Sequence, residues 1–209
     1  MKLGIIGAGN MGSAFAKRLA AAGHEVIITA QNLSHSEQAA SAAGGSVRSV
    51  PHGQIAAEAE LLILATPYGG AVEALRGAGD TNGKIVIDIT NPLNAEMSAL
   101  TVGFTSSAAE EIQKAAPGAR IVKAFNTVFA QILGGEATNN AKVQVLYAGD
   151  DSAAKDSVRS LIESAGFESV DAGPLANARY LEPLGMLNIY LGYVAGRGTG
   201  DAPAWISAA

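Results

Sequence analysis

The sequence opens with the stretch that decides its fold, Lys2-Leu3-Gly4-Ile5-Ile6-Gly7-Ala8-Gly9-Asn10-Met11-Gly12. An apolar run that predicts a β-strand ends in glycines spaced G-x-G-x-x-G, and a predicted helix follows directly. Gly7 permits a tight turn, Gly9 lets the backbone approach a pyrophosphate, and Gly12 lets the helix pack closely on the strand. The N-terminus of that helix offers unpaired N–H groups and a partial positive charge to phosphate oxygens. The stretch therefore predicts a dinucleotide-binding site.

Composition narrows the class of protein around this site. Of the 209 residues 48% are apolar and 16% are charged, the net charge is −5, and no basic block indicates a nucleic-acid partner. There is no cysteine, so thiol catalysis, disulfides and thiolate metal sites are excluded, and we expect no metal site. The chain has neither a leader-like apolar segment nor a run of eighteen apolar residues. We therefore expect a soluble cytoplasmic protein without a membrane partner.

Strands and helices alternate through the first half of the chain. Predicted strands cover 2–6, 25–29, 46–50, 61–65 and 84–89, with helical segments between them. This alternation is typical of an α/β protein with a doubly wound parallel (Rossmann) sheet. Right-handed crossovers place the carboxyl ends of all the strands at one edge, where ligands bind. The loops at that edge are 7–12, 30–33, 66–70 and 90–93.

The second half predicts a small C-terminal α/β extension. Strands are expected at 120–124, 143–148 and 168–172, and a last helix at 175–194. We expect an NAD(P)-binding Rossmann domain over 1–125 and a small lobe over 126–209 that serves the acceptor pocket and dimerisation. The last helix carries two apolar stripes, so we expect it to be buried, with a homodimer interface as a suitable place. The stripes are Leu184, Leu187, Leu191 and Val194 on one face, and Met186, Tyr190 and Tyr193 on the other.

The residues after the second strand should select the cofactor. An NAD site usually carries Asp or Glu there, to bind the ribose hydroxyls. Here Ala30, Gln31 and Asn32 take that place, so no carboxylate repels a 2′-phosphate. The candidate donors to such a phosphate are Asn32, Ser34, His35 and, from the third strand, Arg48. We therefore expect NADP(H) rather than NAD(H).

Acid–base side chains are scarce in the second half. Lys123, near the end of the sixth strand, is the one catalytic candidate, and its alternative role is structural. Arg179 could bind an anionic acceptor or be an ordinary surface arginine. Hydride transfer between two preformed redox rings needs positioning and water exclusion more than a proton relay. Two segments, 125–130 and 174–179, suit the role of an apolar lid over the nicotinamide.

Several stretches together carry a family resemblance. They are Gly7–Gly12, Thr66-Pro67, Lys123–Thr127, Gly149–Asp151, and Asp171–Leu175 leading through Asn177 and Arg179 to Glu182. On these residues the chain resembles the NADPH-dependent coenzyme F420 oxidoreductase family and the related reductase domain of membrane ferric reductases. The resemblance runs through almost the whole length.

The resemblance implies NADP(H) on the nucleotide-binding lobe, a deazaflavin or a flavin such as FMN in the cleft with its ring against the nicotinamide, and a homodimer. It implies a phosphate loop of Gly9, Asn10 and Met11. It implies nicotinamide neighbours at Thr66, Pro67, Asn91, Asn126 and Val128, and an acceptor near Phe129, Ala130, Ala176, Asn177 and Arg179. The chain departs from the family at Ala30–Asn32, where the family has a serine–arginine pair, and at Phe129, where it has proline or a small residue.

The sequence thus predicts an NADP(H)-dependent oxidoreductase that passes a hydride to a small redox acceptor, a flavin or F420-like deazaflavin. One alternative is a pyrroline-carboxylate reductase or β-hydroxyacid dehydrogenase-like enzyme, whose loop is similar to Gly7–Gly12. Those families need a long all-helical C-terminal domain, which the strand-rich segment 120–172 does not provide. A further alternative is a non-catalytic NADP(H)-sensing protein.

Overall fold

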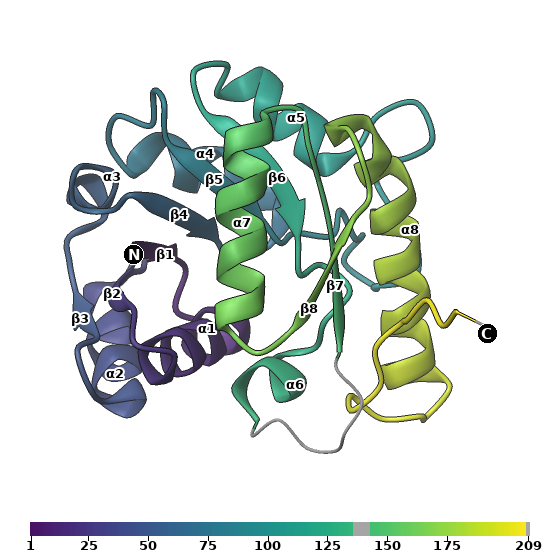
Figure 1. The fold of residues 1–209 in the computed structure, drawn as a ribbon, viewed down its shortest axis with the longest axis horizontal. Helices are drawn as coiled ribbons and strands as arrows, with labels where there is room; N and C mark the ends of the chain where they lie inside the picture. Colours follow the sequence, from purple (N-terminus) through teal and green to yellow (C-terminus); the bar gives the residue numbers. More distant parts are fainter. Residues whose placement is uncertain (136–142, 208–209) are drawn as a thin grey trace.

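A computed structural model describes residues 1–135 and 143–207 of the chain. Eight strands form one sheet in the order β3-β2-β1-β4-β5-β6-β7-β8, with helices packed on both of its faces (Figure 1). The two faces bury separate apolar clusters, one around Phe15 and Val158 and the other around Leu75 and Ile112. The predicted α/β doubly wound fold is confirmed.

The N-terminal half follows the predicted alternation of strands and helices. Its elements are β1 (Lys2–Ile6), α1 (Asn10–Ala21), β2 (Glu25–Thr29), α2 (Leu33–Ala43), β3 (Arg48–Ser49), the 3₁₀ turn η1 (His52–Gln54), α3 (Ile55–Glu58), β4 (Leu61–Leu64), α4 (Tyr68–Gly77) and β5 (Ile85–Asp88). Strand β1 pairs in parallel with both β2 and β4, so the strand order reverses beside it. Such a switch point opens a crevice at the carboxyl ends of the strands, where the glycine loop lies.

The C-terminal half contains one reversal of direction that the sequence did not predict. Its elements are α5 (Ala108–Ala115), β6 (Arg120–Ala124), α6 (Ala130–Gly134), β7 (Gln144–Gly149), α7 (Ser152–Ser164), β8 (Glu168–Asp171), the 3₁₀ turn η2 (Leu175–Asn177), α8 (Ala178–Ile189) and the π-helical turn η3 (Tyr190–Val194). Strand β7 runs antiparallel to β6, and β8 runs parallel to β7. The expectation that all strands end at one edge is therefore wrong for β7 and β8, which end at the opposite edge.

Helix α8 starts at that opposite edge and runs back toward the carboxyl ends of the parallel strands. Pro183 lies inside the helix, which continues on both sides of it. The predicted burial of both apolar stripes is wrong for a single protomer. The exposed apolar side chains of this segment are Leu187, Tyr190, Tyr193 and Val194. Over the described residues, no helix combines the length and the apolar character that crossing a membrane requires.

Candidate functional site

The three glycines of the loop have different roles, because two are required by the fold and one leaves space for a ligand. Gly7 has φ +115°, and a Cβ there would collide with the carbonyl oxygen of Ala65. A Cβ at Gly12 would collide with the carbonyl oxygen of Gly7, so this glycine sets the contact between α1 and β1. A Cβ at Gly9 would meet nothing within 4 Å. Gly7 and Gly12 are therefore required by packing, whereas Gly9 keeps a space open.

The N-terminus of α1 faces this space with unsatisfied donors. Gly9 is the N-cap residue and has no side chain to cap the helix. The N–H of Ser13 is the first to find a partner in the turn, the carbonyl of Gly9 at 2.9 Å. The N–H groups before it, those of Asn10, Met11 and Gly12, are the orphan donors of a helix start. Open space, backbone donors and the helix dipole together fit a pyrophosphate.

A cavity of about 510 Å³ lies on one side of the glycine loop. It gathers the carboxyl ends of β1, β2 and β4, and its lining includes the predicted residues Gly7, Ala30, Gln31, Thr66 and Pro67. The lining also includes His52, whose Nε2 lies 2.8 Å from the carbonyl oxygen of Ala74. No sequence signal marked His52, because its place depends on how η1 packs against α4.

A second cavity, of about 240 Å³, lies on the other side of the loop. It brings together Asn10, Met11, Asn91, Asn126, Val128, Phe129 and Ala130, all of which the sequence predicted, with Ile89, Phe125, Thr127, Gln131, Gly185, Asn188, Ile189 and Tyr193. The predicted nicotinamide neighbours thus divide, since Thr66 and Pro67 line the first cavity. A dinucleotide that spans both cavities would cross the N-terminus of α1.

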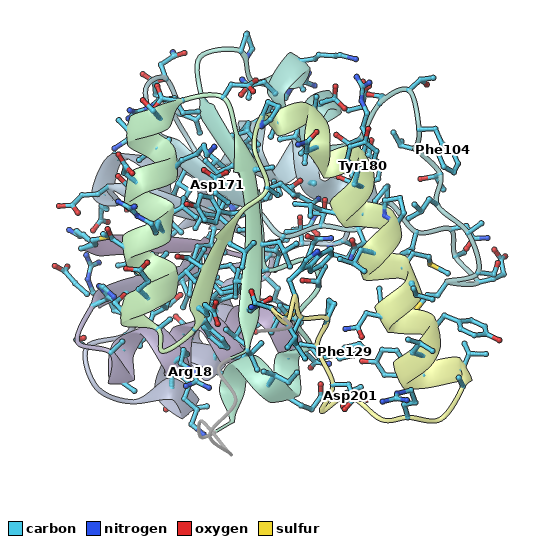
Figure 2. The ribbon with its side chains drawn as sticks, turned by 45° about the vertical axis from the view of Figure 1, so that its right-hand side comes forward. Arg18, Phe104, Phe129, Asp171, Tyr180 and Asp201 are labelled. Atoms are coloured by element: carbon cyan, nitrogen blue, oxygen red, sulfur yellow. The ribbon has the colours of Figure 1, made fainter. Side chains whose placement is uncertain are left out.

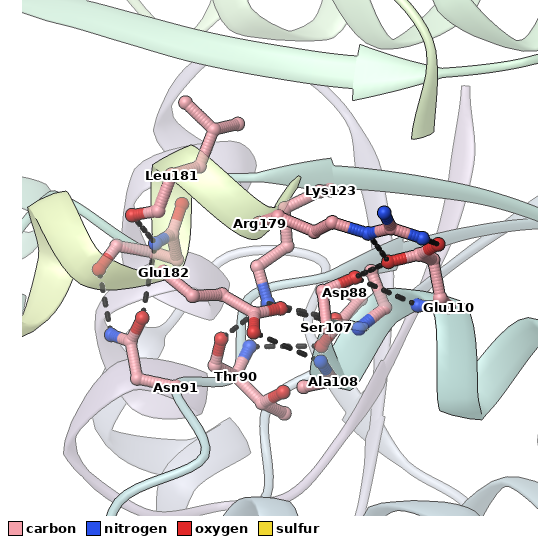
Figure 3. A network of polar contacts seen from close by, with 12 residues as sticks. Asp88, Thr90, Asn91, Ser107, Ala108, Glu110, Lys123, Arg179, Leu181 and Glu182 are labelled. Carbon is pink, nitrogen blue, oxygen red and sulfur yellow. Dashed lines mark hydrogen bonds and ion pairs between the residues drawn. The ribbon is translucent and has the colours of Figure 1, made fainter. Parts of the chain in front are cut away.

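Carboxamides fasten α8 to the strand-end loops beside this second cavity. Nδ2 of Asn126 donates to Oδ1 of Asn91 at 3.0 Å and to the carbonyl of Leu181 at 2.7 Å. Asn91 returns a hydrogen bond from its own Nδ2 to the carbonyl of Asn126, at 2.8 Å (Figure 3). Further along α8, Asn188 donates to the carbonyl of Thr127 at 3.1 Å. These bonds set how far α8 stands from the cavity.

Gly185 allows this close approach, and the sequence analysis missed it. A Cβ at Gly185 would lie 2.6 Å from Oδ1 of Asn91 and 2.8 Å from Nδ2 of Asn126. Both distances are shorter than real side-chain contacts allow, so any larger residue must displace α8 or the two asparagines. A glycine inside a helix was the available signal, because glycine costs helix stability unless packing requires it.

The loop that carries the cavity wall begins with a strained residue. Phe125 has φ +61°, which places a bulky side chain in the left-handed region. Its ring is buried and forms T-shaped pairs with Phe15 and Phe167, at centroid distances of 5.0 and 5.9 Å. This packing holds the backbone in a conformation that costs on the order of 1 kcal/mol or more. The turn redirects the chain from β6 into the loop that lines the cavity.

Lys123 belongs to a buried ionic cluster with Asp88 and Glu182 (Figure 3). Its Nζ lies 2.9 Å from Oδ2 of Asp88 and 2.9 Å from Oε1 of Glu182, and all three side chains are at most 1% exposed. Glu182 also accepts the N–H groups of Ala108 and Ala109 at the start of α5. The cluster joins β5, β6, α5 and α8. Lys123 is not among the residues that line the two cavities at the glycine loop, and its two buried ion pairs favour the structural alternative.

Burial and the neighbouring charges shift the pKa values of Glu182 and Lys123 in this cluster. Burial raises the pKa of Glu182, and Lys123 together with the helix N–H groups opposes that rise. Burial alone would lower the pKa of Lys123, but Asp88 and Glu182 outweigh it and raise the pKa above that of a free lysine. The lysine therefore stays protonated, as an inward anchor for α8.

The predicted acceptor residues do not form one site. Phe129 and Ala130 line the second cavity, whereas Ala176, Asn177 and Arg179 lie at the other end of α8. Arg179 forms a two-bond ion pair with Glu110, at 2.6 and 2.8 Å, and these bonds lower the pKa of Glu110. Asn177 donates to the carbonyl of Ala172. Because β7 and β8 end at the far edge of the sheet, the chain enters α8 from that side, and Ala176, Asn177 and Arg179 are not among the residues that line the second cavity.

The predicted contacts to a 2′-phosphate are also rearranged. Asn32 caps α2, with its Oδ1 accepting from the backbone N–H of Ser34 at 3.0 Å. Arg48 is paired with Glu58 and Glu25 and lies away from the carboxyl end of β2, so it is not a donor to this site. Gln31, Ser34 and His35 are exposed. Oγ of Ser34 donates to Oδ1 of Asn32 at 2.8 Å. Of the three residues, Gln31 lines the first cavity.

Comparisons with known proteins agree with this geometry. Residues 2–92 match the family model described as NADP oxidoreductase, coenzyme F420-dependent. The chain is 31% identical to the F420-dependent NADP reductase of Methanothermobacter marburgensis over 210 residues, which cover 91% of this chain and 92% of that protein. The chain belongs to this family. It is therefore an NADP-dependent oxidoreductase.

More distant and structural relatives fit the same assignment. The chain is 29% identical over 186 residues to rat metalloreductase STEAP3, and it spans only 36% of that protein's length. A candidate F420-dependent NADP reductase from Arthrobacter sp. FB24 superposes with a TM-score of 0.85 at 31% identity, covering 95% of this chain and 96% of the other. A reductive aminase from Aspergillus terreus shares the fold alone, with a TM-score of 0.67 at 22% identity over 93% of this chain and 62% of the aminase.

Proposed function

We propose that this oxidoreductase transfers a hydride between NADP(H) and a planar acceptor of the flavin or deazaflavin type. The observation that carries the proposal is the lining of the 240 Å³ cavity. Its described residues are apolar or carry a carboxamide or hydroxyl, and Lys, Arg, His, Asp and Glu are absent from them. Reduction of a carbonyl or an imine places the hydride on carbon and a proton on the oxygen or nitrogen, and enzymes usually supply that proton from a side chain. This lining offers only the hydroxyl groups of Tyr193 and Thr127 for that purpose.

A ring acceptor removes that need. A bound NADPH would supply the hydride from C4 of its dihydronicotinamide to N5 of a flavin or C5 of a deazaflavin, and solvent would supply the proton that a ring nitrogen takes up. The protein has to hold the two rings face to face and keep water out. Apolar walls for that purpose come from Val128, Phe129 and Ile189. Among the described residues Oδ1 of Asn126 is buried without a hydrogen-bond partner, and Asn126 lines the same cavity, which supports a role in accepting a hydrogen bond from the nicotinamide carboxamide.

Two observations support NADP(H) as the dinucleotide, namely the family of the chain and the charge of the loop after β2. The loop after β2 carries no carboxylate that would repel a 2′-phosphate, and Gln31, Ser34 and His35 offer exposed polar groups there. The open space at Gly9 and the donors of Asn10 and Met11 fit the pyrophosphate.

We also propose that segment 126–209 acts as a second lobe, which carries the acceptor side of the cavity and a dimer interface. The exposed apolar side chains at the end of α8 form a surface suited to a second copy of the chain. Light scattering coupled to size-exclusion chromatography measures the mass directly. A monomer at micromolar concentration would contradict the homodimer and leave the hydride-transfer proposal untouched.

The test of the proposed activity is NADPH oxidation in the presence of different acceptors. We expect turnover with a deazaflavin of the F420 type or with FMN, and little with 1-pyrroline-5-carboxylate. Gly9→Val serves as the control for a reaction at this site. Turnover with the pyrroline alone would assign the enzyme to the imine-reducing alternative, and NADPH binding without any turnover would favour a sensing protein.

A further inference from the structure

Two aromatic side chains close the second cavity, where the nicotinamide is expected, on the side away from the glycine loop. Phe129 comes from the loop after β6, and Tyr193 comes from the π-helical turn η3. Their rings form a T-shaped pair with centroids 5.5 Å apart and planes at 85°. Both line the cavity, and Figure 2 shows Phe129 beside the end of α8 opposite to Tyr180. No other role in the site accounts for this pair.

Phe129 is held in place. Its side chain is only 7% exposed, and it precedes the first turn of α6. The tip of its ring abuts the backbone of η3, because a Cβ at Gly192 would lie 2.7 Å from Cζ of Phe129. The same Cβ would lie 3.1 Å from Cε2 of Phe129, so one edge of the ring lies against Gly192. Phe129 is thus a fixed wall.

Tyr193 is held much less firmly. It is 58% exposed, and it belongs to a single π-helical turn. Such turns are rare, have less regular hydrogen bonding than an α-helix and occur often at functional sites. An aromatic pair of this kind contributes about 1 kcal/mol beyond its buried area. A flat ring that makes an equal contact with Phe129 can therefore replace Tyr193.

The size of the cavity requires such a replacement. Pockets for drug-sized ligands start at about 300 Å³. The cavity of about 240 Å³ must hold the nicotinamide beside Asn10 and Met11 before any acceptor enters. With the aromatic pair closed, the cavity is smaller than a pocket for one drug-sized ligand, whereas the proposed reaction needs two stacked rings.

We infer that Tyr193 occupies the place of the acceptor's ring system and swings out when the acceptor binds, and that Phe129 is the wall against which the acceptor then packs. The pair makes the enzyme selective for flat aromatic acceptors, because only such a ring restores the contact that Phe129 loses. This inference rests on the proposed function, since it concerns the acceptor of the same reaction.

The test measures FMN binding to the NADP⁺ complex, in which both partners are oxidised and no hydride moves. Quenching of FMN fluorescence gives the dissociation constant. Tyr193→Ala should bind FMN about fivefold more tightly, the equivalent of about 1 kcal/mol for the pair that no longer has to open. Phe129→Leu alone should bind FMN within about twofold of wild type, because it loses the contact with Tyr193 and the contact with FMN together. The double variant Tyr193→Ala/Phe129→Leu should bind FMN about fivefold more weakly than Tyr193→Ala, because only the contact with FMN is then lost. Tyr180→Ala is the matched control, because Tyr180 is a 72% exposed tyrosine of the same helix that lies outside this cavity.

A second measurement separates the two proposals. The ratio of kcat/KM for FMN to kcat/KM for p-benzoquinone, a one-ring acceptor, should rise in Tyr193→Ala. Equal FMN binding by wild type and Tyr193→Ala would overturn the role of the pair, even if FMN is reduced. Tighter FMN binding by Tyr193→Ala without reduction of FMN or a deazaflavin would keep the role of the pair and overturn the proposed activity. FMN that is neither bound nor reduced by any of the variants would overturn both.

Discussion

The second cavity lies between two regions of the molecule. One is the glycine loop, and the other is a wall formed by the loop after β6 together with α8. The two regions are held in place by different kinds of contact. Gly7 and Gly12 are fixed by backbone contacts to β4 and to each other. The wall depends on hydrogen bonds between residues far apart in the chain, such as Asn126 to Leu181, which are separated by 55 residues. The loop therefore depends on local backbone geometry, whereas the wall depends on where α8 docks.

Because the two regions are held differently, we expect their variants to affect different properties, namely dinucleotide binding for the glycine loop and the rate of hydride transfer for the wall. Damage to the ligand-facing part of the loop should weaken dinucleotide binding and leave the fold intact. Damage to the anchors of α8 should lower stability and the rate of hydride transfer together. The predictions below test this division, from the largest expected effect to the smallest.

Lys123→Met should have the largest effect on stability. The variant leaves Asp88 and Glu182 buried without their cation, and breaking a buried ion pair in this way costs about 3–5 kcal/mol of unfolding free energy. Urea unfolding measures the loss. Lys114→Met is the control, because Lys114 forms an exposed pair with Glu111 and its removal should cost about 0.5 kcal/mol or less. Equal midpoints for the two variants would show that the cluster does not anchor α8.

Gly9→Val should weaken NADPH binding by at least about thirtyfold, the equivalent of one lost charge-assisted hydrogen bond to the pyrophosphate. A Cβ at position 9 meets nothing within 4 Å, so the unfolding midpoint should stay close to wild type. Gly12→Val, which collides with the backbone of Gly7, should instead lower the midpoint. Calorimetric titration and thermal unfolding of both variants test the division. Unchanged NADPH affinity in Gly9→Val would remove the loop from the site.

Gly185→Ala should displace α8 from the loops that carry Asn91 and Asn126. The added methyl group conflicts with Asn91 and Asn126, so we expect a loss of about 1–3 kcal/mol, typical of an overpacked site. The displacement of α8 should lower kcat more than it changes the dissociation constant of NADPH. Gly69→Ala, where a Cβ meets nothing within 4 Å, is the control. A Gly185→Ala variant with wild-type kcat would show that the rate does not depend on the position of α8.

Alkaline pH should weaken the anchor gradually. The pKa of Lys123 is raised in the folded protein, so the cluster's contribution is fully present below the pKa of an unfolded lysine, about 10.5. It is lost as the pH rises through the higher folded value. Urea midpoints measured between pH 8 and pH 11.5 should fall more steeply for wild type than for Lys123→Met. Parallel curves would assign the alkaline loss to other groups.

Arg48→Ala should have the smallest effect. Because Arg48 pairs with Glu58 and Glu25, its removal should leave the preference for NADPH over NADH within about twofold of wild type, the scale of a surface ion pair. The ratio of the two dissociation constants measures this preference. A large drop for NADPH alone would place Arg48 at the 2′-phosphate after all. His35→Ala, exposed beside the first cavity, gives the comparison for a residue that remains a candidate.

The sequence by itself determined the doubly wound sheet, the bounds of most of its elements and the glycine loop. The reason is that these features depend on the hydrophobic period of short segments and on backbone conformations that only glycine tolerates. The family resemblance that the sequence carries also implied Asn91 and Asn126, and both line the second cavity.

Only the tertiary structure decided the course of α8. The direction of β7 rests on its pairing with β6, and no pattern within either strand distinguishes a parallel from an antiparallel neighbour here. That one choice carried Ala176, Asn177 and Arg179 away from the site and brought Gly185 and Tyr193 to it. It also turned Lys123 from a catalytic candidate into a buried anchor, since Glu182 reaches it only when α8 is docked. Long-range contacts made these decisions, and the free energy of a long-range contact depends on partners that local sequence does not specify.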